Sequence, residues 1–297
     1  NQRKSVALIV LIGLVLLSMG YALGLAMDPA LGAAGLAVAA IVWAVMMAIS
    51  LAGGEALLLR QAGAREIRKS DSPRLFNVVE EMQLAAGLAH APRVYLIDAP
   101  QPNAFAVGRT EERAAVAVTT GLLARLNRDE LQGVVAHELA HIRNRDTLFM
   151  TLAGTTMGAI ILLADFYVRG LRFRNAARRS SSGNGKGAGA LILVAVVLAI
   201  LAPLLARLLY FACSRRREYL ADACAAQFTR YPEGLASALE KLATQQEGGD
   251  RDNRVLAPLY IVNPSAAAGT SGNWFSTHPP LTDRVRVLRG MAGGRSG

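Results

Sequence analysis

The sequence predicts a mainly α-helical membrane protein with a small α+β domain outside the bilayer. Apolar residues make up 53% of the 297 positions, charged residues only 18%, and the mean hydropathy is +0.31. A soluble domain carries about 25% charged residues. Four apolar runs are long enough to cross a hydrocarbon core of about 30 Å, and the segment between the second and third runs has the turn and cap signals of short helices and strands.

The four runs predict four transmembrane helices. Residues 5–27 and 29–54 contain no charged residue, residues 147–167 are interrupted only by Asp165, and residues 187–214 only by Arg207. Each run is close to or above the 20 helical residues that a bilayer requires. We therefore divide the chain into an N-terminal membrane hairpin (1–58), a first extramembrane segment (59–146), a second membrane hairpin (147–213) and a C-terminal segment (214–297).

Basic residues predict the orientation of these helices. Cytoplasmic loops are enriched in Lys and Arg, and such residues lie before the first run and after the second, but not between them: Arg3, Lys4, Arg60, Arg65, Arg68 and Lys69. We therefore expect the N-terminus and residues 59–146 to be cytoplasmic. The third and fourth runs are less simple, because six basic residues and no acid lie between them, so this loop is either exported or part of a hairpin that does not fully cross.

The net charge of +10 raises the alternative of a nucleic-acid partner. The basic residues are scattered, however, and several flank apolar runs, where membrane topology explains them. We expect a lipid bilayer as a partner, and no nucleic acid.

Residues 59–146 predict a compact segment of helices and strands. Ser72 followed by Pro73 is typical of a helix start, and residues 93–98, 103–108 and 114–119 are predicted strands. Asn127 is followed by two acids, Asp129 and Glu130, and has the pattern of a capping box. The helix that it begins continues almost without interruption into the third apolar run.

This last helix carries the pattern HExxH at His137, Glu138 and His141. Residues four apart on a helix lie above one another, so both imidazoles can bind one cation while Glu138 acts on a water beside it. The pattern favours a catalytic zinc site, which usually has three protein ligands and one open position. The candidates for the third ligand are His90, His278 and a carboxylate.

Glu218 and Asp222 are the strongest carboxylate candidates. They lie four apart directly after the fourth apolar run, so one can bind the metal while the other orients a histidine. Since the second membrane hairpin returns to the side it left, it brings this segment back to the HExxH helix. The alternative for Glu218 is a surface ion pair with Arg215, Arg216 or Arg217.

Three blocks of the sequence resemble the motif blocks of the M48 membrane metallopeptidases, in particular the bacterial HtpX-like heat-shock proteases. They are HELAHIRNRD (137–146), SRRREYLADACAA (214–226) and STHPPLTDRVRVL (276–288). With PNAFA (102–106) and the four runs, the resemblance covers nearly the whole chain. Residues 180–189 and 248–271 have no counterpart in it.

The resemblance implies a role for each matching residue. His137, His141 and Glu218 would bind one Zn²⁺ per chain, and Glu138 would be the general base and acid. Asp222 would orient a ligand histidine, while His278, a catalytic residue that helps to stabilise the oxyanion, and Arg284 would lie near the cleft. The resemblance also implies an edge strand that binds the substrate backbone, formed by Asn103, Ala104, Phe105 and Ala106.

A zinc-dependent endopeptidase of the bacterial inner membrane is the function that this resemblance implies. It would cleave misfolded or damaged membrane proteins, or unfolded polypeptides, at the cytoplasmic face, as part of protein quality control under stress. Two alternatives stay open: a non-catalytic membrane scaffold with a structural zinc site, and a protease that processes prenylated peptides.

Overall fold

The computed structural model describes residues 29–148, 151, 215–243 and 279–293, with scattered residues between 10 and 25. The third and fourth predicted membrane runs lie almost entirely outside these residues, and so do most of the first run, the segment 248–271 and His278.

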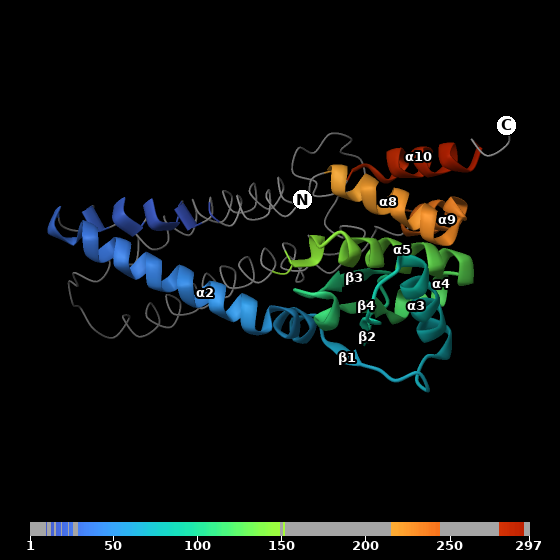
Figure 1. The fold of residues 1–297 in the computed structure, drawn as a ribbon, viewed down its shortest axis with the longest axis horizontal. Helices are drawn as coiled ribbons and strands as arrows, with labels where there is room; N and C mark the ends of the chain where they lie inside the picture. The colour runs from blue at the N-terminus through green and yellow to red at the C-terminus, as the bar shows by residue number, and fades with distance from the viewer. Residues whose placement is uncertain are drawn as a thin grey trace, which may run out of the picture.

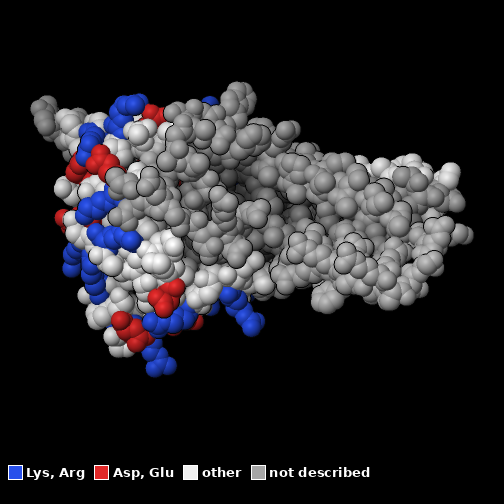
Figure 2. Space-filling model, turned by 180° about the vertical axis from the view of Figure 1, so that it is seen from behind, with Lys and Arg blue, Asp and Glu red and all other residues white. Residues whose placement is uncertain are grey.

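One described helix is long and apolar enough to cross a membrane. The 3₁₀ turn η1 (Pro29–Leu31) leads into α2 (Gly32–Gln61), and together they form a 33-residue span that contains an 18-residue window with a mean hydropathy of 2.3. The helix extends away from the globular part of the described chain (Figure 1), and the charged side chains of the described residues gather on that globular part (Figure 2). The helix is interrupted at Gly53, whose φ of −161° and ψ of 26° are not helical.

A small mixed sheet follows α2. Its strands are β1 (Ala64–Glu66), β2 (Arg93–Ile97), β3 (Ala104–Val107) and β4 (Ala115–Thr119), in the order β1-β2-β4-β3. β2 and β4 are parallel, and the other two pairs are antiparallel. Three of these strands confirm the sequence prediction to within one residue at each end, whereas β1 was not predicted, because three residues carry no readable alternation.

Helix α5 (Arg128–Arg143) lies at the centre of the globular part. On one side it packs against α3 (Pro73–Ala86) and the sheet, and on the other against α8 (Arg215–Thr229) and α9 (Pro232–Ala243). Helix α10 (Leu281–Gly293) packs on α9 and α8, so the C-terminal elements cover α5 (Figure 1). The short helices η2 (Glu111–Arg113) and α4 (Thr120–Arg125) flank β4.

The two faces of the sheet belong to two different cores. Alternate strand residues point to opposite faces, and one set, which includes Val94, Ala106 and Val116, joins the helices α3, α5, α8 and α9 in the main core. The other set packs with the end of α2 in a second cluster: Leu58, Leu59, Ala62, Tyr95, Ile97, Phe105, Val107, Ala115 and Ala117. The candidate membrane helix is thus built into the domain through the sheet.

The start of α5 confirms the predicted capping box. The Asn127 side chain accepts a hydrogen bond from the Glu130 amide, and the Glu130 carboxylate accepts one from the Asn127 amide. The end of α5 corrects the prediction of an almost uninterrupted helix. Asn144 and Arg145 form a turn in which Arg145 has a φ of 58°, and helical structure resumes at residues 146–148.

Candidate metal centre

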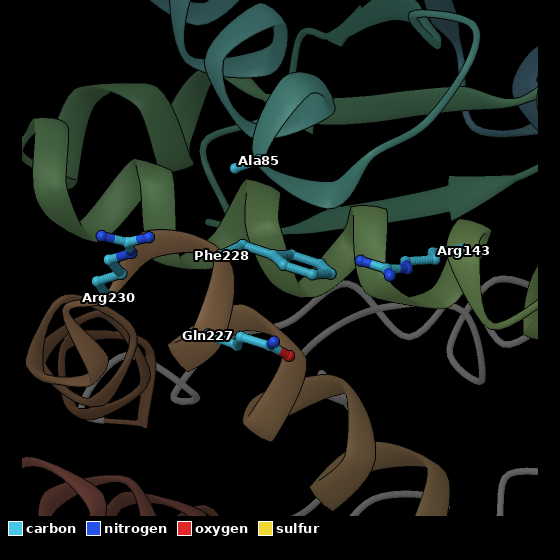
Figure 3. A pocket seen from close by; sticks show the side chains of 5 residues that line it. All are labelled: Ala85, Arg143, Gln227, Phe228 and Arg230. Carbon is cyan, nitrogen blue, oxygen red and sulfur yellow. The ribbon is translucent and has the colours of Figure 1, made fainter.

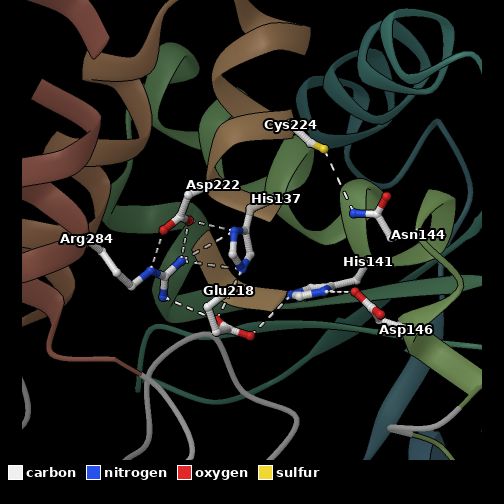
Figure 4. A network of polar contacts seen from close by, with 8 residues as sticks. All are labelled: His137, His141, Asn144, Asp146, Glu218, Asp222, Cys224 and Arg284. Atoms are coloured by element: carbon white, nitrogen blue, oxygen red, sulfur yellow. Dashed lines mark hydrogen bonds and ion pairs between the residues drawn. The ribbon is translucent and has the colours of Figure 1, made fainter. Parts of the chain in front are cut away.

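The structure brings His137 and His141 of α5 together with Glu218 of α8 (Figure 4). One donor atom from each residue lies within 4.8 Å of the other two, and all three residues are buried. Glu218 is only 2% exposed, so it does not form the surface ion pair that was its alternative. His90 is exposed and lies outside this group.

The spacing of the donor atoms fits one shared cation. Nε2 of His137 lies 3.7 Å from Oε2 of Glu218, and Nε2 of His141 lies 3.6 Å from Oε1. Both distances are too long for hydrogen bonds. Zinc binds such ligands at about 2.0–2.2 Å in a tetrahedral array, which places neighbouring donors about 3.3–3.6 Å apart. Two imidazoles and one carboxylate are also a donor set found in catalytic zinc sites.

Two buried aspartates contact the Nδ1 atoms of the two candidate ligand histidines. Oδ1 of Asp222 lies 2.9 Å from Nδ1 of His137, and Oδ2 of Asp146 lies 3.4 Å from Nδ1 of His141. A carboxylate on Nδ1 leaves Nε2 facing the metal position. The turn at Asn144 and Arg145 brings Asp146 back to His141, and this contact was missed at the sequence level. The feature of the sequence that could have indicated this contact is the position of Asp146 as the last residue of the HELAHIRNRD block.

Arg284 connects α10 to this centre. Its guanidinium donates two hydrogen bonds to Asp222, of 2.8 and 2.7 Å, and NH1 lies 3.6 Å from Oε2 of Glu218. Arg284 is 0% exposed. Burial alone would raise the pKa of the Asp222 carboxyl, but the charge and hydrogen bonds of Arg284 outweigh it and lower that pKa to about 2. Asp222 is therefore a permanent anion beside His137.

Arg217 is a second arginine of the centre, and its role was not predicted from the sequence. It is buried, and its NH1 lies 3.7 Å from Oδ1 of Asp146. Each aspartate that holds a ligand histidine thus has an arginine next to it. These opposite charges reduce the cost of burying several carboxylates together.

Glu138 is buried beside the three candidate ligands. Burial raises the pKa of its carboxyl to about 7, against the opposing effects of His141, Arg284 and a hydrogen bond from the Ala106 backbone. A general base works best with a pKa near the operating pH. Burial and the nearby Arg284 lower the pKa of His137.

The pKa of His141 moves the other way. Burial would lower it, but the Asp146 hydrogen bond and the charges of Glu218 and Glu138 raise it to about 9. In the metal-free protein a proton therefore occupies this imidazole at neutral pH, and a metal ion has to displace it.

The predicted substrate strand lies next to this centre. β3 is at the edge of the described sheet and contacts α5, and Ala104, Phe105 and Ala106 belong to it. Asn103 precedes the strand, and its side chain accepts a hydrogen bond of 3.0 Å from the Ala104 amide. Of these four residues, Ala106 contacts Glu138, through a backbone hydrogen bond, whereas Phe105 packs on the other face of the sheet with the end of α2. His278 lies outside the described residues.

A separate hollow of about 450 Å³ opens between α3, α5 and α8 (Figure 3). Its lining contains none of the predicted site residues, and the Arg143 guanidinium stacks over the Phe228 ring at 5.4 Å from its centre. The remaining lining residues are Ala85, Gln227 and Arg230. The hollow is therefore separate from the candidate metal site.

The fold and the site together define a metallopeptidase associated with a membrane. Two histidines on one helix, a carboxylate from a distant helix and a buried glutamate between them are the parts that such an enzyme needs, and α2 supplies the candidate membrane helix.

Comparison with known proteins identifies the family. Residues 69–292 match the model of peptidase family M48, and the chain belongs to this family. It is 44% identical to the protease HtpX homolog of Dictyoglomus thermophilum over 98% of this chain and 92% of that protein. It is 39% identical to the homolog of Thermoanaerobacter pseudethanolicus over 98% and 95% of the two chains. The chain is thus an HtpX-like membrane metalloprotease, which confirms the resemblance seen in the sequence.

A solved structure also matches. The crystal structure of S. mikatae Ste24p superposes with a TM-score of 0.49 at 19% identity, covering 96% of this chain and 64% of that one.

Proposed function

We propose that this protein is a zinc-dependent endopeptidase that cleaves misfolded or damaged membrane proteins at the cytoplasmic face of the bacterial inner membrane. One zinc ion per chain would be held by His137, His141 and Glu218. The observation that carries the proposal is the position of Glu138, a buried carboxyl with a pKa raised to about 7 beside all three ligands. A purely structural zinc site has no use for such a group, which disfavours the scaffold alternative.

The residues of the chain have separate tasks in this reaction. A zinc ion held by His137, His141 and Glu218 would supply a Lewis acid for the scissile carbonyl and would lower the pKa of a bound water. Glu138 accepts the proton of the attacking water and passes it to the leaving amine. Asp222 and Asp146 keep the two imidazoles in place, Arg284 holds Asp222, and His278 donates a hydrogen bond to the oxyanion that develops on the carbonyl.

The β3 strand would hold the substrate. An extended peptide can add to the edge of a sheet through backbone hydrogen bonds, without a requirement for particular side chains. Residues 103–106 are suited to this because the Ala106 backbone hydrogen-bonds Glu138 and because, among the described residues, β3 pairs with β4 alone. Such binding fits substrates that share no sequence, such as unfolded segments.

The membrane arrangement follows from the four apolar runs. We propose a multi-pass protein with four transmembrane helices, an N-terminal hairpin (1–58) and a second hairpin (147–213), with the N-terminus and the site in the cytoplasm. The site would lie near the membrane surface, because α5 leads into the third run and α8 follows the fourth. The segments 59–146 and 214–297 would together form one catalytic domain.

Zinc analysis combined with a cleavage assay tests this proposal on the wild type and Glu138→Gln. We expect both proteins to contain one zinc ion per chain, and Glu138→Gln to cleave an unfolded membrane protein about 10²–10⁴-fold more slowly, the usual contribution of general acid–base catalysis. Glu233→Gln, which alters an exposed partner of Arg289, is the matched control. Cleavage by Glu138→Gln at the wild-type rate would contradict the proposal.

A further inference from the structure

The loop between β3 and β4 is fastened to the membrane helix α2 at the point where that helix is interrupted. Around Gly53, the carbonyl oxygen of Leu51 accepts a hydrogen bond of 3.1 Å from Arg109, and that of Ala52 accepts one of 3.0 Å from Arg113. Both arginines belong to the loop. A break in a helix frees carbonyl groups that are costly to leave unsatisfied at a membrane, so the two guanidiniums stabilise the interrupted form of α2.

An ion pair strengthens the same junction. Nε of Arg113 lies 2.8 Å from Oε1 of Glu55, and the Glu55 side chain is only 2% exposed. Glu55 lies two residues after the interruption, at the domain end of α2. One guanidinium thus binds the carboxylate and the Ala52 carbonyl together, which requires the fork geometry of arginine. We call Glu55, Arg109 and Arg113 the α2 clamp.

The loop that carries the arginines has a fixed shape. Gly108, at its start, has a φ of 135°, and a Cβ atom there would lie 2.6 Å from Cα of Ala114, so only glycine fits. The Gly108 amide also donates a hydrogen bond of 3.2 Å to Oγ1 of Thr151, which follows α5. Because the loop cannot easily deform, a force on its arginines is passed to β3.

The clamp therefore connects the membrane helix to the reaction centre by a short route. Gly108 follows directly on β3, and the Ala106 backbone in β3 hydrogen-bonds Glu138. The opposite face of the sheet packs on Leu58 and Leu59 of α2 and on Ala62, which directly follows that helix. The apolar contact holds the sheet against α2. The hydrogen bonds and the ion pair of the clamp are directional, and they fix the height and the angle of the sheet along the helix.

We propose that the α2 clamp determines which peptide bonds are cut, by holding the β3 strand at one height above the bilayer. This inference rests on the proposed peptidase function and adds Glu55 and Arg113 as positioning residues. A substrate with its own membrane helix presents each of its bonds at a defined distance from the bilayer. Only the bonds that reach the height of β3 and Glu138 are then cleaved, whereas a free peptide has no such restriction.

The test compares two substrates with the full-length protein in lipid vesicles. One substrate is a single-span protein with an unfolded cytoplasmic segment, and the other is the same segment as a soluble peptide. Since a misplacement of about 1 Å can cost on the order of 100-fold in rate, we expect Glu55→Gln and Arg113→Ala to lower kcat/KM for the anchored substrate about tenfold. Mass spectrometry of its products should show cuts over a wider range of positions than with the wild type.

Three controls separate positioning from folding. Cleavage of the soluble peptide and zinc content should stay at wild-type levels in both variants. Arg113→Lys should fall between wild type and Arg113→Ala, because one ammonium keeps the charge but loses the fork. Glu80→Gln, which alters an exposed 2.6 Å pair with Lys69, should behave as the wild type.

Two results would overturn the inference. One is an unchanged rate and cut position on the anchored substrate in both clamp variants. The other is an equal loss on both substrates together with loss of zinc, which would show that the clamp only supports folding. Failure of the peptidase function itself would look different, since the wild type would then cleave neither substrate, or Glu138→Gln would cleave both.

Discussion

Asp146 and Asp222 contact the two proposed ligand histidines in the same way, each at the Nδ1 atom. They come from different parts of the chain, and each is backed by an arginine, Arg217 or Arg284. Loss of such a supporting carboxylate typically costs 10–100-fold in metal affinity or activity. The residues that fix the histidines therefore belong to the site as much as the ligands do.

The metal-free protein should lose stability as the pH rises. The pKa of His141 is about 9 in the folded chain and about 6.5 in an unfolded chain. The folded state binds this proton more tightly, so its contribution to stability is fully present below about pH 6.5 and is lost as the pH rises through about 9. The pKa of Glu138 is also raised, to about 7, so its contribution to stability is likewise lost as the pH rises, but already through about pH 7.

Thermal unfolding of the chelator-treated protein measures this effect. We expect the melting temperature of the wild type to fall between pH 6.5 and 9, and Asp146→Asn to show a smaller fall, because a cause of the raised His141 pKa is removed. Asp98→Asn, an exposed change in the same domain, should follow the wild type. A wild-type melting temperature that is constant or rising over this range would contradict the assignment.

Among the helices, α5 shows how local sequence and packing make different demands. Gly133 weakens the helix by propensity, yet α9 approaches so closely that a Cβ atom at Gly133 would lie 2.6 Å from the Leu235 amide nitrogen. Glycine therefore stands there because two helices touch. The sequence alone shows only that glycine lowers the helix propensity at this position.

Two glycine-to-alanine changes should have opposite effects on stability. Gly133→Ala should destabilise the protein by about 1–3 kcal/mol through overpacking, although alanine gains about 1 kcal/mol in helix propensity. Gly290→Ala in α10, where nothing lies within 4 Å of the added atom, should stabilise by about 0.5–1 kcal/mol. Denaturant unfolding of both variants checks this, and a stabilising Gly133→Ala would contradict the packing.

The elements with strong local signals could be predicted, and those defined by distant contacts could not. The Asn127 capping box and the three longer strands were readable because caps and alternation lie within a few residues. β1 is defined by its antiparallel pairing with β2, in which Glu66 lies opposite Tyr95. The turn at Asn144 and Arg145 was missed, since no glycine or proline marks it.

At the scale of the whole molecule, the metal centre joins segments about 80 residues apart in sequence. Spacing and position in the chain were enough to single out His137, His141, Glu218 and Asp222 as candidates, and the resemblance of the motif blocks then implied a role for each. The contact of Arg217 with Asp146 could not be predicted, because the sequence does not distinguish Arg217 from the two arginines before it. Only the packing of the fold shows which of the three is buried at the site. Arg284, in the third block, completes the same network from α10.

Measurement of zinc in Glu218→Ala tests most directly whether this long-range assembly forms the metal site. We predict one zinc ion per chain in the wild type, and loss of most of the zinc in Glu218→Ala at the same free zinc concentration, with Glu233→Ala unchanged. Wild-type zinc content and affinity in Glu218→Ala would show that Glu218 is not a ligand and would contradict the proposed centre.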